Sequence, residues 1–450
     1  MWELMNPLLG ELEAKICDRS AVIGVIGLGY VGLPVACSFA SQGFRVLGVD
    51  RARERASQID RGQLPMTGTE PGLAELLAEV ARSGSIRAGD DYEPLREADV
   101  VTLNVETPVN EHQRPEYEAL AQACRSLARV LKRGALVIVE STISPGTTDG
   151  LVRRTLEEAG LQLGRDFFLG HCPERVMPGK LLLNLRTMSR VCGGTDADTA
   201  RVMCELYRWI VEAELDQTDC VTAEIVKTAE NAYRDVNIAF ANELALICSA
   251  VGADFLAVRE LVNKSPGRNV LLAGAGVGGH CIPKDPWLLA AADGLDRPLQ
   301  LIPAARRIND AMPSYIGQLV SRGLAEAGRP LEDARLAIMG WSYLEDSDDT
   351  RSSPSAALLA ELQRAGAQVV VDDPMVPEYR CALGRASALD AVVFMVAHTA
   401  YRNMDLSLLR RRMRTAVLVD GRNMFQPRVV TGAGFRYFGV GRSEVRREWS

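Results

Sequence analysis

Several features that would place a chain in a well-known functional class are missing from this 450-residue sequence. Basic residues do not outnumber acidic ones: 51 Lys and Arg stand against 58 Asp and Glu, a formal net charge of −7. This balance argues against general nucleic-acid binding, because the phosphate backbone attracts proteins with a basic surface. There is no apolar stretch of about 18 residues, so we expect no transmembrane helix and no membrane partner.

Paired cysteines and histidine clusters are missing as well. The ten Cys are scattered, none of them in a C-x-x-C spacing, and there are four His, so we expect no metal site. Residues 1–20 lack a basic segment followed by an apolar run and do not resemble a secretory signal. Scattered Cys without such a signal fit a reducing compartment. We therefore expect a cytoplasmic protein of about two to four domains.

The first strong pattern is a glycine-rich motif between two apolar runs. The run 21–26 is followed by Gly27-Leu28-Gly29-Tyr30-Val31-Gly32, a helical segment to about residue 41 and a second run at 44–49 that ends at Asp50. This order of strand, glycines, helix, strand and acid is typical of a dinucleotide-binding domain. In such a domain Gly27 allows the tight turn, Gly29 the approach of the pyrophosphate, and Gly32 the close packing of helix on strand.

Asp50 is expected to accept hydrogen bonds from the adenosine ribose and to repel a 2′-phosphate, so the predicted cofactor is NAD. Arg51 and Arg53 follow closely and soften this preference. The alternative is a glycine-rich turn that binds FAD or no nucleotide. Two more apolar strands, at 99–105 and 135–139, end near Thr107 and Thr142. These threonines are candidate cofactor or active-site contacts and, equally, candidate turn or capping residues.

The middle of the chain contains a long segment without Pro or Gly, 222–250, which is predicted to be one helix. Lys227, Asn231 and Arg234 share one face of it and can hold an anionic ligand; the alternative is a solvated polar stripe. A glycine-rich segment at 269–279 follows, and Cys281 comes directly after it. Cys281 is a candidate thiolate nucleophile, although most free Cys are buried and inert.

The last third alternates again, with apolar strands at 335–340, 367–371, 391–396 and 415–419. It lacks a G-x-G-x-x-G, so from its residues alone it is either a second nucleotide-binding unit or a docking unit. The predicted fold class is α/β, with two Rossmann-like, doubly wound parallel-sheet domains joined by a long central helix and an all-α middle domain. The expected parts are an N-terminal extension at 1–20, a cofactor domain at 21–215, a helical domain at 216–315, a C-terminal domain at 316–435 and a tail at 436–450.

Six segments together resemble the UDP-glucose/GDP-mannose dehydrogenase family of NAD-dependent nucleotide-sugar 6-dehydrogenases. They are GVIGLGYVGLP at 24–34, STISPGTT at 141–148, CPERVMPGK at 172–180, AEIVKTAENAYRDVNIAFANEL at 223–244, GVGGHCIPKDPW at 276–287 and SDDTRSSPS at 347–355. RDVNIAFANEL and GGHCI look more like the members that act on UDP-N-acetylhexosamines. The resemblance implies oxidation of the sugar C6 alcohol to a carboxylate with two NAD. UDP-N-acetyl-D-mannosamine is the first expected substrate and UDP-N-acetylglucosamine the next.

The resemblance also implies residue roles. Cys281 would form a thiohemiacetal and then a thioester, while Lys227 and Asn231 stabilise the oxyanions. Glu174 would position or activate the hydrolytic water, or act as a base. Asp285 and Thr142 would hold the water and orient Lys227. The implied cofactor contacts are Gly27, Gly29, Tyr30, Val31, Gly32, Asp50, Arg55, Thr107, Thr142 and Arg351. The implied substrate contacts are Glu174, Arg175, Val176, Lys227, Asn231, Arg234, Arg268, Asn269, Gly276 and Gly278.

Three departures from the family pattern concern the sugar pocket. Leu344 stands where members usually have Lys. The acetamido-sugar members often have a His and an Arg just before the glycine loop, whereas here Arg268 or Lys264 is expected to substitute from a shifted position. The loop also lacks its usual prolines. Leu344 also motivates a different reading, a non-catalytic nucleotide-sugar sensor or scaffold. The C-terminal domain is expected to bind the uridine and diphosphate of a UDP-sugar. The helix at 222–250 resembles the family's dimer core, so we expect a homodimer or a dimer-based oligomer.

Overall fold

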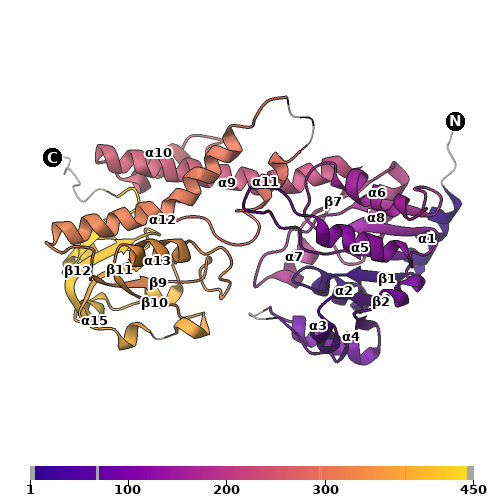
Figure 1. Ribbon diagram of the computed structural model, residues 1–450, viewed down its shortest axis with the longest axis horizontal. Helices are drawn as coiled ribbons and strands as arrows, with labels where there is room; N and C mark the ends of the chain where they lie inside the picture. The colour runs from indigo at the N-terminus through magenta and orange to yellow at the C-terminus, as the bar shows by residue number, and fades with distance from the viewer. Residues whose placement is uncertain (1–5, 67–69, 293, 295, 381, 443–450) are drawn as a thin grey trace. The chain divides into compact units, whose positions relative to one another are not determined.

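The computed structural model describes residues 6–66, 70–292, 294, 296–380 and 382–442. The chain divides into two compact units, residues 1–230 with 287–297 and residues 231–286 with 298–450. Each unit contains one mainly parallel sheet covered by helices (Figure 1). The predicted pair of Rossmann-like α/β sheets is confirmed. Cys381 and residues 443–450 of the expected tail lie outside the described residues.

The first unit is built on an eight-stranded sheet. Its strands are β1 (Val22–Ile26), β2 (Arg45–Val49), β3 (Ile86–Gly89), β4 (Val100–Leu103), β5 (Ala135–Val139), β6 (Phe167–His171), β7 (Arg190–Gly194) and β8 (Leu215–Asp219). Their order is β3-β2-β1-β4-β5-β6-β7-β8. All neighbours pair in parallel except β6 and β7, which are antiparallel. β5 and β6 are buried along their whole length, as expected of strands covered on both faces.

The helices of the first unit include one that the sequence does not assign to a domain. They are α1 (Pro7–Asp18), α2 (Gly32–Ser41), α3 (Arg53–Asp60), α4 (Leu73–Ser83), α5 (Glu118–Ala128), α6 (Arg153–Glu158), α7 (Leu181–Thr187) and α8 (Ala197–Tyr207), with short turns η1 (Glu93–Glu97) and η2 (Thr148–Val152). Helix α1 buries Leu9, Leu12 and Ile16 in the core of this unit. Lys15 also donates to Asp99 at 2.9 Å. Residues 7–18 are therefore part of the first unit's core.

The predicted long helix is confirmed as α9 (Cys220–Val251). The division between the two units falls inside it, after Glu230. The helical middle expected at 216–315 therefore contributes to both units.

The second unit is built on a five-stranded, fully parallel sheet. Its strands are β9 (Arg335–Met339), β10 (Gln368–Asp372), β11 (Leu389–Phe394), β12 (Met413–Asp420) and β13 (Arg436–Gly439), in the order β10-β9-β11-β12-β13. The expectation that the tail begins at 436 is wrong, because β13 pairs with β12 from Val417 opposite Arg436 to Asp420 opposite Gly439. A strand this short has too few residues to show a clear periodicity in the sequence.

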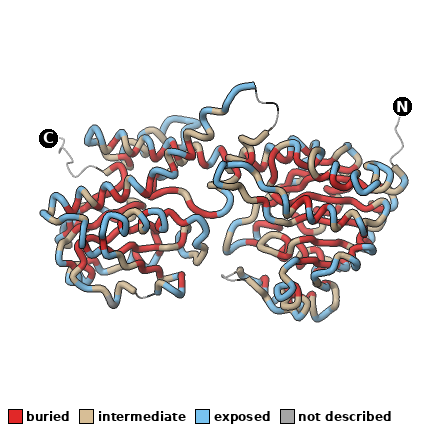
Figure 2. The backbone as a smooth tube through the Cα atoms, viewed as in Figure 1, coloured by how far each residue is buried: buried red, intermediate tan, exposed pale blue. Residues whose placement is uncertain are grey.

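The remaining helices are α10 (Phe255–Asn263), α11 (Asp285–Ala290), α12 (Leu301–Glu326), α13 (Pro354–Arg364), α14 (Thr399–Arg402), α15 (Leu406–Arg410) and α16 (Pro427–Gly432), with turns η3 (Pro377–Tyr379) and η4 (Leu383–Arg385). Figure 2 shows that buried backbone is concentrated in the strands of both sheets. Across the described ranges, no helix is both long enough and apolar enough to cross a bilayer.

Candidate active site

The turn after β1 has glycine wherever the backbone leaves no room for a side chain. Gly27 has a φ of +90°, and a Cβ on it would lie 2.4 Å from the carbonyl oxygen of Asn104. A Cβ on Gly32 would lie 1.9 Å from the carbonyl oxygen of Gly27. A Cβ on Gly29 would meet no heavy atom within 4 Å, so the backbone there faces open space. A dinucleotide pyrophosphate fits this open backbone at the start of α2.

Asp50 lies directly after β2 and is 4% exposed. Its carboxylate accepts the backbone N–H groups of Leu28 at 2.9 Å and Ala52 at 2.8 Å. Arg55, an expected cofactor contact, donates to the same carboxylate at 3.2 Å. Arg51, expected to weaken the preference for NAD, pairs with Glu106 at 2.5 Å. These contacts fix the acid beside the glycine turn, where an acid selects a free ribose hydroxyl.

The other expected cofactor residues of the first unit lie at the same edge of the sheet. The Tyr30 hydroxyl donates to Glu70 at 2.5 Å, and Glu70 also accepts the backbone N–H of Gly179 at 2.7 Å. The glycine turn is thereby tied to the segment 172–180. Thr107 Oγ1 donates to the carbonyl oxygen of Thr142 at 2.7 Å, so the threonines that follow β4 and β5 lie together. Val31 immediately precedes α2.

Glu174 belongs to a buried ionic group. It pairs with Arg190, and Arg190 Nη1 also lies 3.6 Å from Glu140. The Tyr207 hydroxyl donates to Glu140 at 2.6 Å. Burial raises the pKa of Glu140 to about 7; Arg190 opposes this change and Glu174 reinforces it. Our sequence reasoning missed Glu140, Arg190 and Tyr207, although an Arg opening the apolar run RVCGG was a usable signal, since Arg is rarely buried unless paired.

The two residues after Glu174 have different surroundings. Arg175 donates to the carbonyl oxygen of Ser189 at 2.8 Å and to Glu230 at 3.2 Å. Val176 is half-buried against the core of the first unit. The expected substrate segment is thus fixed at Arg175 by contacts within its own unit.

Asp285 is held between Asn231 and Lys284. Asn231 Nδ2 donates to Asp285 Oδ2 at 2.6 Å, and Lys284 Nζ lies 3.0 Å from Asp285 Oδ1. The Asp285 N–H donates to the carbonyl oxygen of Cys281 at 2.8 Å, so the exposed Cys281 lies one helical turn before the acid. Lys227 is 9% exposed and precedes Asn231 by one turn of α9. Arg234 is exposed further along the same helix.

The glycine loop before Cys281 packs against the segment 340–354. A Cβ on Gly276 would lie 3.1 Å from Pro354, and one on Gly278 would lie 2.5 Å from Cβ of Tyr343. The Gly279 N–H donates to the carbonyl oxygen of Arg351 at 2.8 Å. The guanidinium of Arg351 pairs with Asp349 at 2.5 Å.

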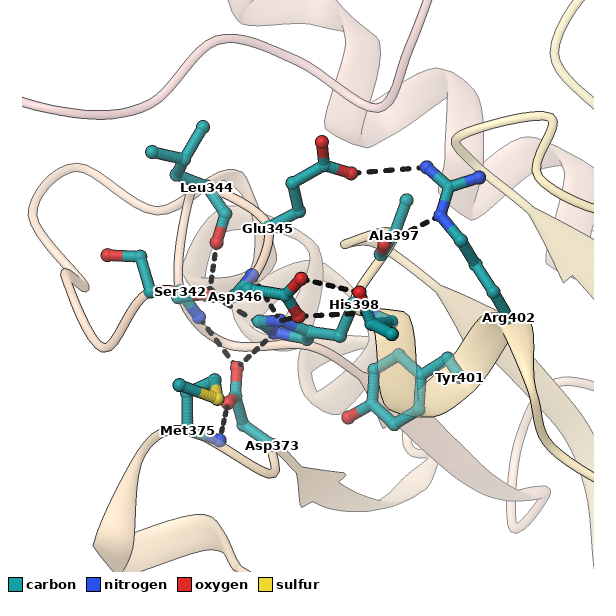
Figure 3. Close-up of polar contacts among 12 residues, drawn as sticks. Ser342, Leu344, Glu345, Asp346, Asp373, Met375, Ala397, His398, Tyr401 and Arg402 are labelled. Carbon is teal, nitrogen blue, oxygen red and sulfur yellow. Dashed lines mark hydrogen bonds and ion pairs between the residues drawn. The ribbon is translucent and has the colours of Figure 1, made fainter. Parts of the chain in front are cut away.

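Three other residues that the sequence analysis singles out are exposed. Arg268 donates to the carbonyl oxygen of Pro266 at 2.8 Å, and Asn269 follows it. Leu344 is 40% exposed, and its carbonyl oxygen accepts the Ser342 hydroxyl at 2.9 Å (Figure 3). The side chain of Leu344 offers no polar group to a ligand.

A glycine turn with its acid, placed after the first strand of a Rossmann-like sheet, is typical of a dinucleotide-dependent dehydrogenase. Models of the UDP-glucose/GDP-mannose dehydrogenase family match the chain in three parts. These are the NAD binding domain at residues 21–211, the central domain at 221–311 and the UDP binding domain at 337–427. The chain belongs to this family, whose members are NAD-dependent nucleotide-sugar dehydrogenases.

The relatives include proteins named for different acetamido sugars. The UDP-N-acetyl-D-mannosamine dehydrogenase of Pyrococcus horikoshii is 38% identical over 424 residues, covering 94% of this chain and 100% of that one. The NDP-N-acetyl-D-galactosaminuronic acid dehydrogenase of Ralstonia nicotianae is 35% identical over 420 residues, covering 90% and 96%. A solved structure of the UDP-D-ManNAc dehydrogenase from P. horikoshii has a TM-score of 0.88 and covers 94% of this chain and 100% of that one.

Proposed function

We propose that this protein oxidises C6 of a UDP-N-acetylhexosamine, first of all UDP-N-acetyl-D-mannosamine, to the uronate in two hydride transfers. The bond between Asn231 and Asp285, one turn after the exposed Cys281, supports this proposal most directly. This cluster combines an amide donor from α9 with a carboxylate that lies one helical turn after the thiol. A one-step alcohol dehydrogenase has no use for the thiol.

The C6 alcohol loses a hydride and a proton and becomes an aldehyde. The Cys281 thiol adds to the aldehyde carbon, forming a C–S bond and a thiohemiacetal. Loss of a second hydride and proton gives a thioester, and water then cleaves the C–S bond to release the carboxylate and restore the thiol. NAD supplies the hydride acceptor in both oxidations.

Each remaining candidate has a task in this scheme. The Asn231 amide and the Lys227 ammonium stabilise the alkoxide and the tetrahedral oxyanions, and one such donor is typically worth about 3–4 kcal/mol. Asp285 orients the Asn231 amide and, with Thr142, holds the water. Glu174 positions or activates that water, and Arg190 pairs with the Glu174 carboxylate and fixes its place.

The NAD and nucleotide contacts follow the family division. Gly27, Gly29 and Gly32 would cradle the pyrophosphate and Asp50 would bind the ribose, while Thr107, Tyr30 and Val31 complete this end of the site. Arg351 is a further proposed NAD contact, and the C-terminal part of the second unit would bind the uridine diphosphate. The substrate contacts proposed outside the catalytic cluster are Arg175, Val176, Arg234, Arg268, Asn269, Gly276 and Gly278.

The sugar itself is the point on which the relatives differ. UDP-N-acetylglucosamine or another nucleotide sugar is the second candidate, because relatives of similar identity are named for mannosamine and galactosamine derivatives. The exposed Leu344 favours a sugar that needs no cation at this position. It is also the observation behind the sensor alternative, in which the sugar binds and is not oxidised.

The test is the amount of NADH formed per sugar with NAD and a panel of UDP- and GDP-sugars. Two NADH per sugar, fastest with UDP-N-acetyl-D-mannosamine, is the expected result. One NADH and an aldehyde product would contradict the thioester route, and nucleotide-sugar binding without turnover would favour the sensor. Cys281→Ser should abolish uronate formation, whereas Cys17→Ser, the matched change at another exposed cysteine, should preserve it.

We also propose a homodimer formed through α9. Tyr233, Phe240, Ile247 and Val251 are between 54% and 72% exposed and recur at helical spacing on this helix. A row of large exposed apolar side chains marks an interaction surface, and the family resemblance points to a second copy of the chain. Light scattering should give a dimer for the wild type and a monomer for Phe240→Glu. Val429→Glu, a control at an exposed apolar residue of α16, should remain dimeric.

A further inference from the structure

Ser342, His398 and Asp373 lie together where β9, β10 and β11 end (Figure 3). Ser342 Oγ and Asp373 Oδ2 lie 3.3 and 3.2 Å from the same ring nitrogen, Nε2 of His398. In a hydrolytic triad the serine and the acid contact opposite ring nitrogens. All three side chains here are fully buried as well. The cluster is therefore a structural anchor and not a second catalytic centre.

The anchor fixes His398 in one tautomer. The Asp346 N–H donates to Nδ1 at 2.9 Å, so Nδ1 carries no proton, and the proton on Nε2 faces Asp373. Asp373 accepts the backbone N–H groups of Trp341 at 2.6 Å and Ser342 at 2.9 Å. His398 and Asp373 thus hold two places on the segment that follows β9.

That segment, residues 340–351, is closed into a loop. The Tyr343 N–H donates to the carbonyl oxygen of Asp349 at 3.0 Å. Asp346, at a φ of +53°, accepts the Thr399 N–H at 2.9 Å and its hydroxyl at 2.6 Å. Since a non-glycine residue rarely adopts this backbone conformation, contacts from His398 and Thr399 are needed to keep it.

The same loop supports the backbone that leads to Cys281. Gly279 donates to the Arg351 carbonyl at 2.8 Å. A Cβ on Gly279 would lie 2.8 Å from the Tyr343 ring, so the glycine backbone rests directly on that side chain. Cys281 is two residues further on. A shift of the loop therefore moves the backbone that carries the thiol.

We propose that His398 is a positioning residue for the second oxidation: by fixing loop 340–351 it holds Gly279, and through it the Cys281 thiol, in line with the aldehyde. This inference rests on the function proposed above. The first hydride transfer does not use the thiol. Loss of His398 should therefore slow the conversion of aldehyde to uronate more than that of alcohol to aldehyde.

The test measures the two steps separately on the full-length protein, with the UDP-sugar alcohol in the first turnover and with the prepared UDP-sugar aldehyde. In His398→Ala we expect the aldehyde step to slow about 10- to 100-fold relative to the alcohol step, the usual consequence of a misplacement of about 1 Å. His398→Asn, whose amide oxygen can accept the Asp346 N–H, should recover part of this loss. Thr399→Val, at an exposed position, removes the hydroxyl bond to Asp346 and should act in the same direction more weakly.

Glu345→Gln is the matched control. Glu345 is next to Asp346 and makes an exposed pair with Arg402 at 3.1 Å, so its replacement should leave the ratio of the two steps unchanged. Equal slowing of both steps in the His398 and Thr399 variants, or no slowing, would overturn the inference. If His398→Ala does not fold, His398→Asn and Thr399→Val decide the matter. A wild-type protein that leaves the aldehyde unoxidised would overturn the proposed function itself.

Discussion

The loops that follow β1 in the first sheet and β9 in the second begin with the same backbone geometry but continue differently. Gly27 after β1 and Gly340 after β9 have φ values of +90° and +101°. Each glycine N–H donates at 2.8 Å to the last carbonyl of the neighbouring strand, on Val49 and Asp372 respectively. The backbone is thus alike at the two points where the order of strands reverses.

The acids that follow the neighbouring strands are also alike. Asp50 accepts the N–H of Leu28, and Asp373 accepts those of Trp341 and Ser342. In the first sheet α2 begins at Gly32, directly after the turn, whereas in the second the long loop 340–353 precedes α13. The length of the loop, more than the sheet or the acid, therefore decides whether a helix N-terminus lies at the turn, where it could hold a pyrophosphate.

The largest effect should come from closing the first loop. Gly32→Ala places a Cβ against the Gly27 carbonyl, and we expect NAD to bind about 100-fold more weakly, equivalent to about 3 kcal/mol of overpacking. Calorimetric titration with NAD checks this. Gly150→Ala is the control, because its Cβ would meet just the end of the Arg154 side chain, at 3.7 Å. Unchanged NAD affinity in Gly32→Ala would show that the turn is not the cradle.

The two acids should respond differently to the same replacement. Asp373→Asn turns an amide toward backbone N–H donors in a fully buried site, and the free energy of unfolding should fall by about 2–3 kcal/mol. Asp50→Asn should instead weaken NAD binding by about tenfold and reduce the ratio of NAD affinity to NADP affinity. Denaturant unfolding and cofactor titration separate the two results. A large stability loss in both variants would mean that Asp50, too, is mainly structural.

The pKa of Asp373 predicts how the stability of the protein changes in acid. Burial raises the pKa of Asp373, but hydrogen bonds from His398 and from backbone N–H groups outweigh it and hold the pKa at about 2, below the ordinary 3.8. A lowered pKa contributes stability above pH 3.8 that is lost as the pH falls toward 2. Asp373→Asn should therefore flatten the stability curve between pH 4 and pH 2. An unchanged slope there would contradict the assignment.

Glu140, after β5 in the first sheet, should show the opposite dependence. Its pKa is raised from 4.5 to about 7, so its contribution to stability is complete below pH 4.5 and is lost as the pH rises through 7. Glu140→Gln removes this loss. Its free energy of unfolding, relative to that of the wild type, should therefore be higher at pH 8.5 than at pH 5 by on the order of 2 kcal/mol. Thermal unfolding at the two pH values measures it. An equal gain in stability at both pH values would show that the titration of Glu140 is not its cause.

The smallest effect should come from the exposed cation beside the first acid. Arg51→Gln breaks a surface pair with Glu106, and the free energy of unfolding should change by less than about 1 kcal/mol. A small change in the ratio of NAD to NADP affinity is expected as well. If the variant changed that ratio as strongly as Asp50→Asn, the preference would be set by Arg51 and not by the acid.

The sequence predicted both sheets, the long helix and the glycine turn because their signals are local. Apolar strands, a segment without Gly or Pro, and Gly27 to Gly32 each carry their pattern within a few residues. Helix α1 and strand β13 were missed. Helix α1 packs on the core of the first unit through residues that are distant in the sequence, and β13 is too short to show a period. The antiparallel junction of β6 and β7 has no local signal at all.

The candidate site also contains residues with a local sequence signal and residues without one. Cys281, Asn231 and Asp285 were named from motifs, and the structure brings Asn231 and Asp285 together. Arg190 begins β7, Glu140 directly follows β5 and Tyr207 ends α8. The anchor of His398 and Asp373 joins loops that follow different strands. Such contacts depend on how strands are ordered in the sheet, which spacing along one chain does not contain.

The distribution of the cysteines makes this protein convenient to label. Of the nine that the structure describes, Cys17 and Cys281 are exposed and the other seven are buried. A maleimide dye offered to the folded protein should thus mark these two sites before any other described thiol. In a background with both Cys17→Ser and Cys381→Ser, the mass added to the intact chain would report on the environment of Cys281 directly, without substrate, cofactor or turnover.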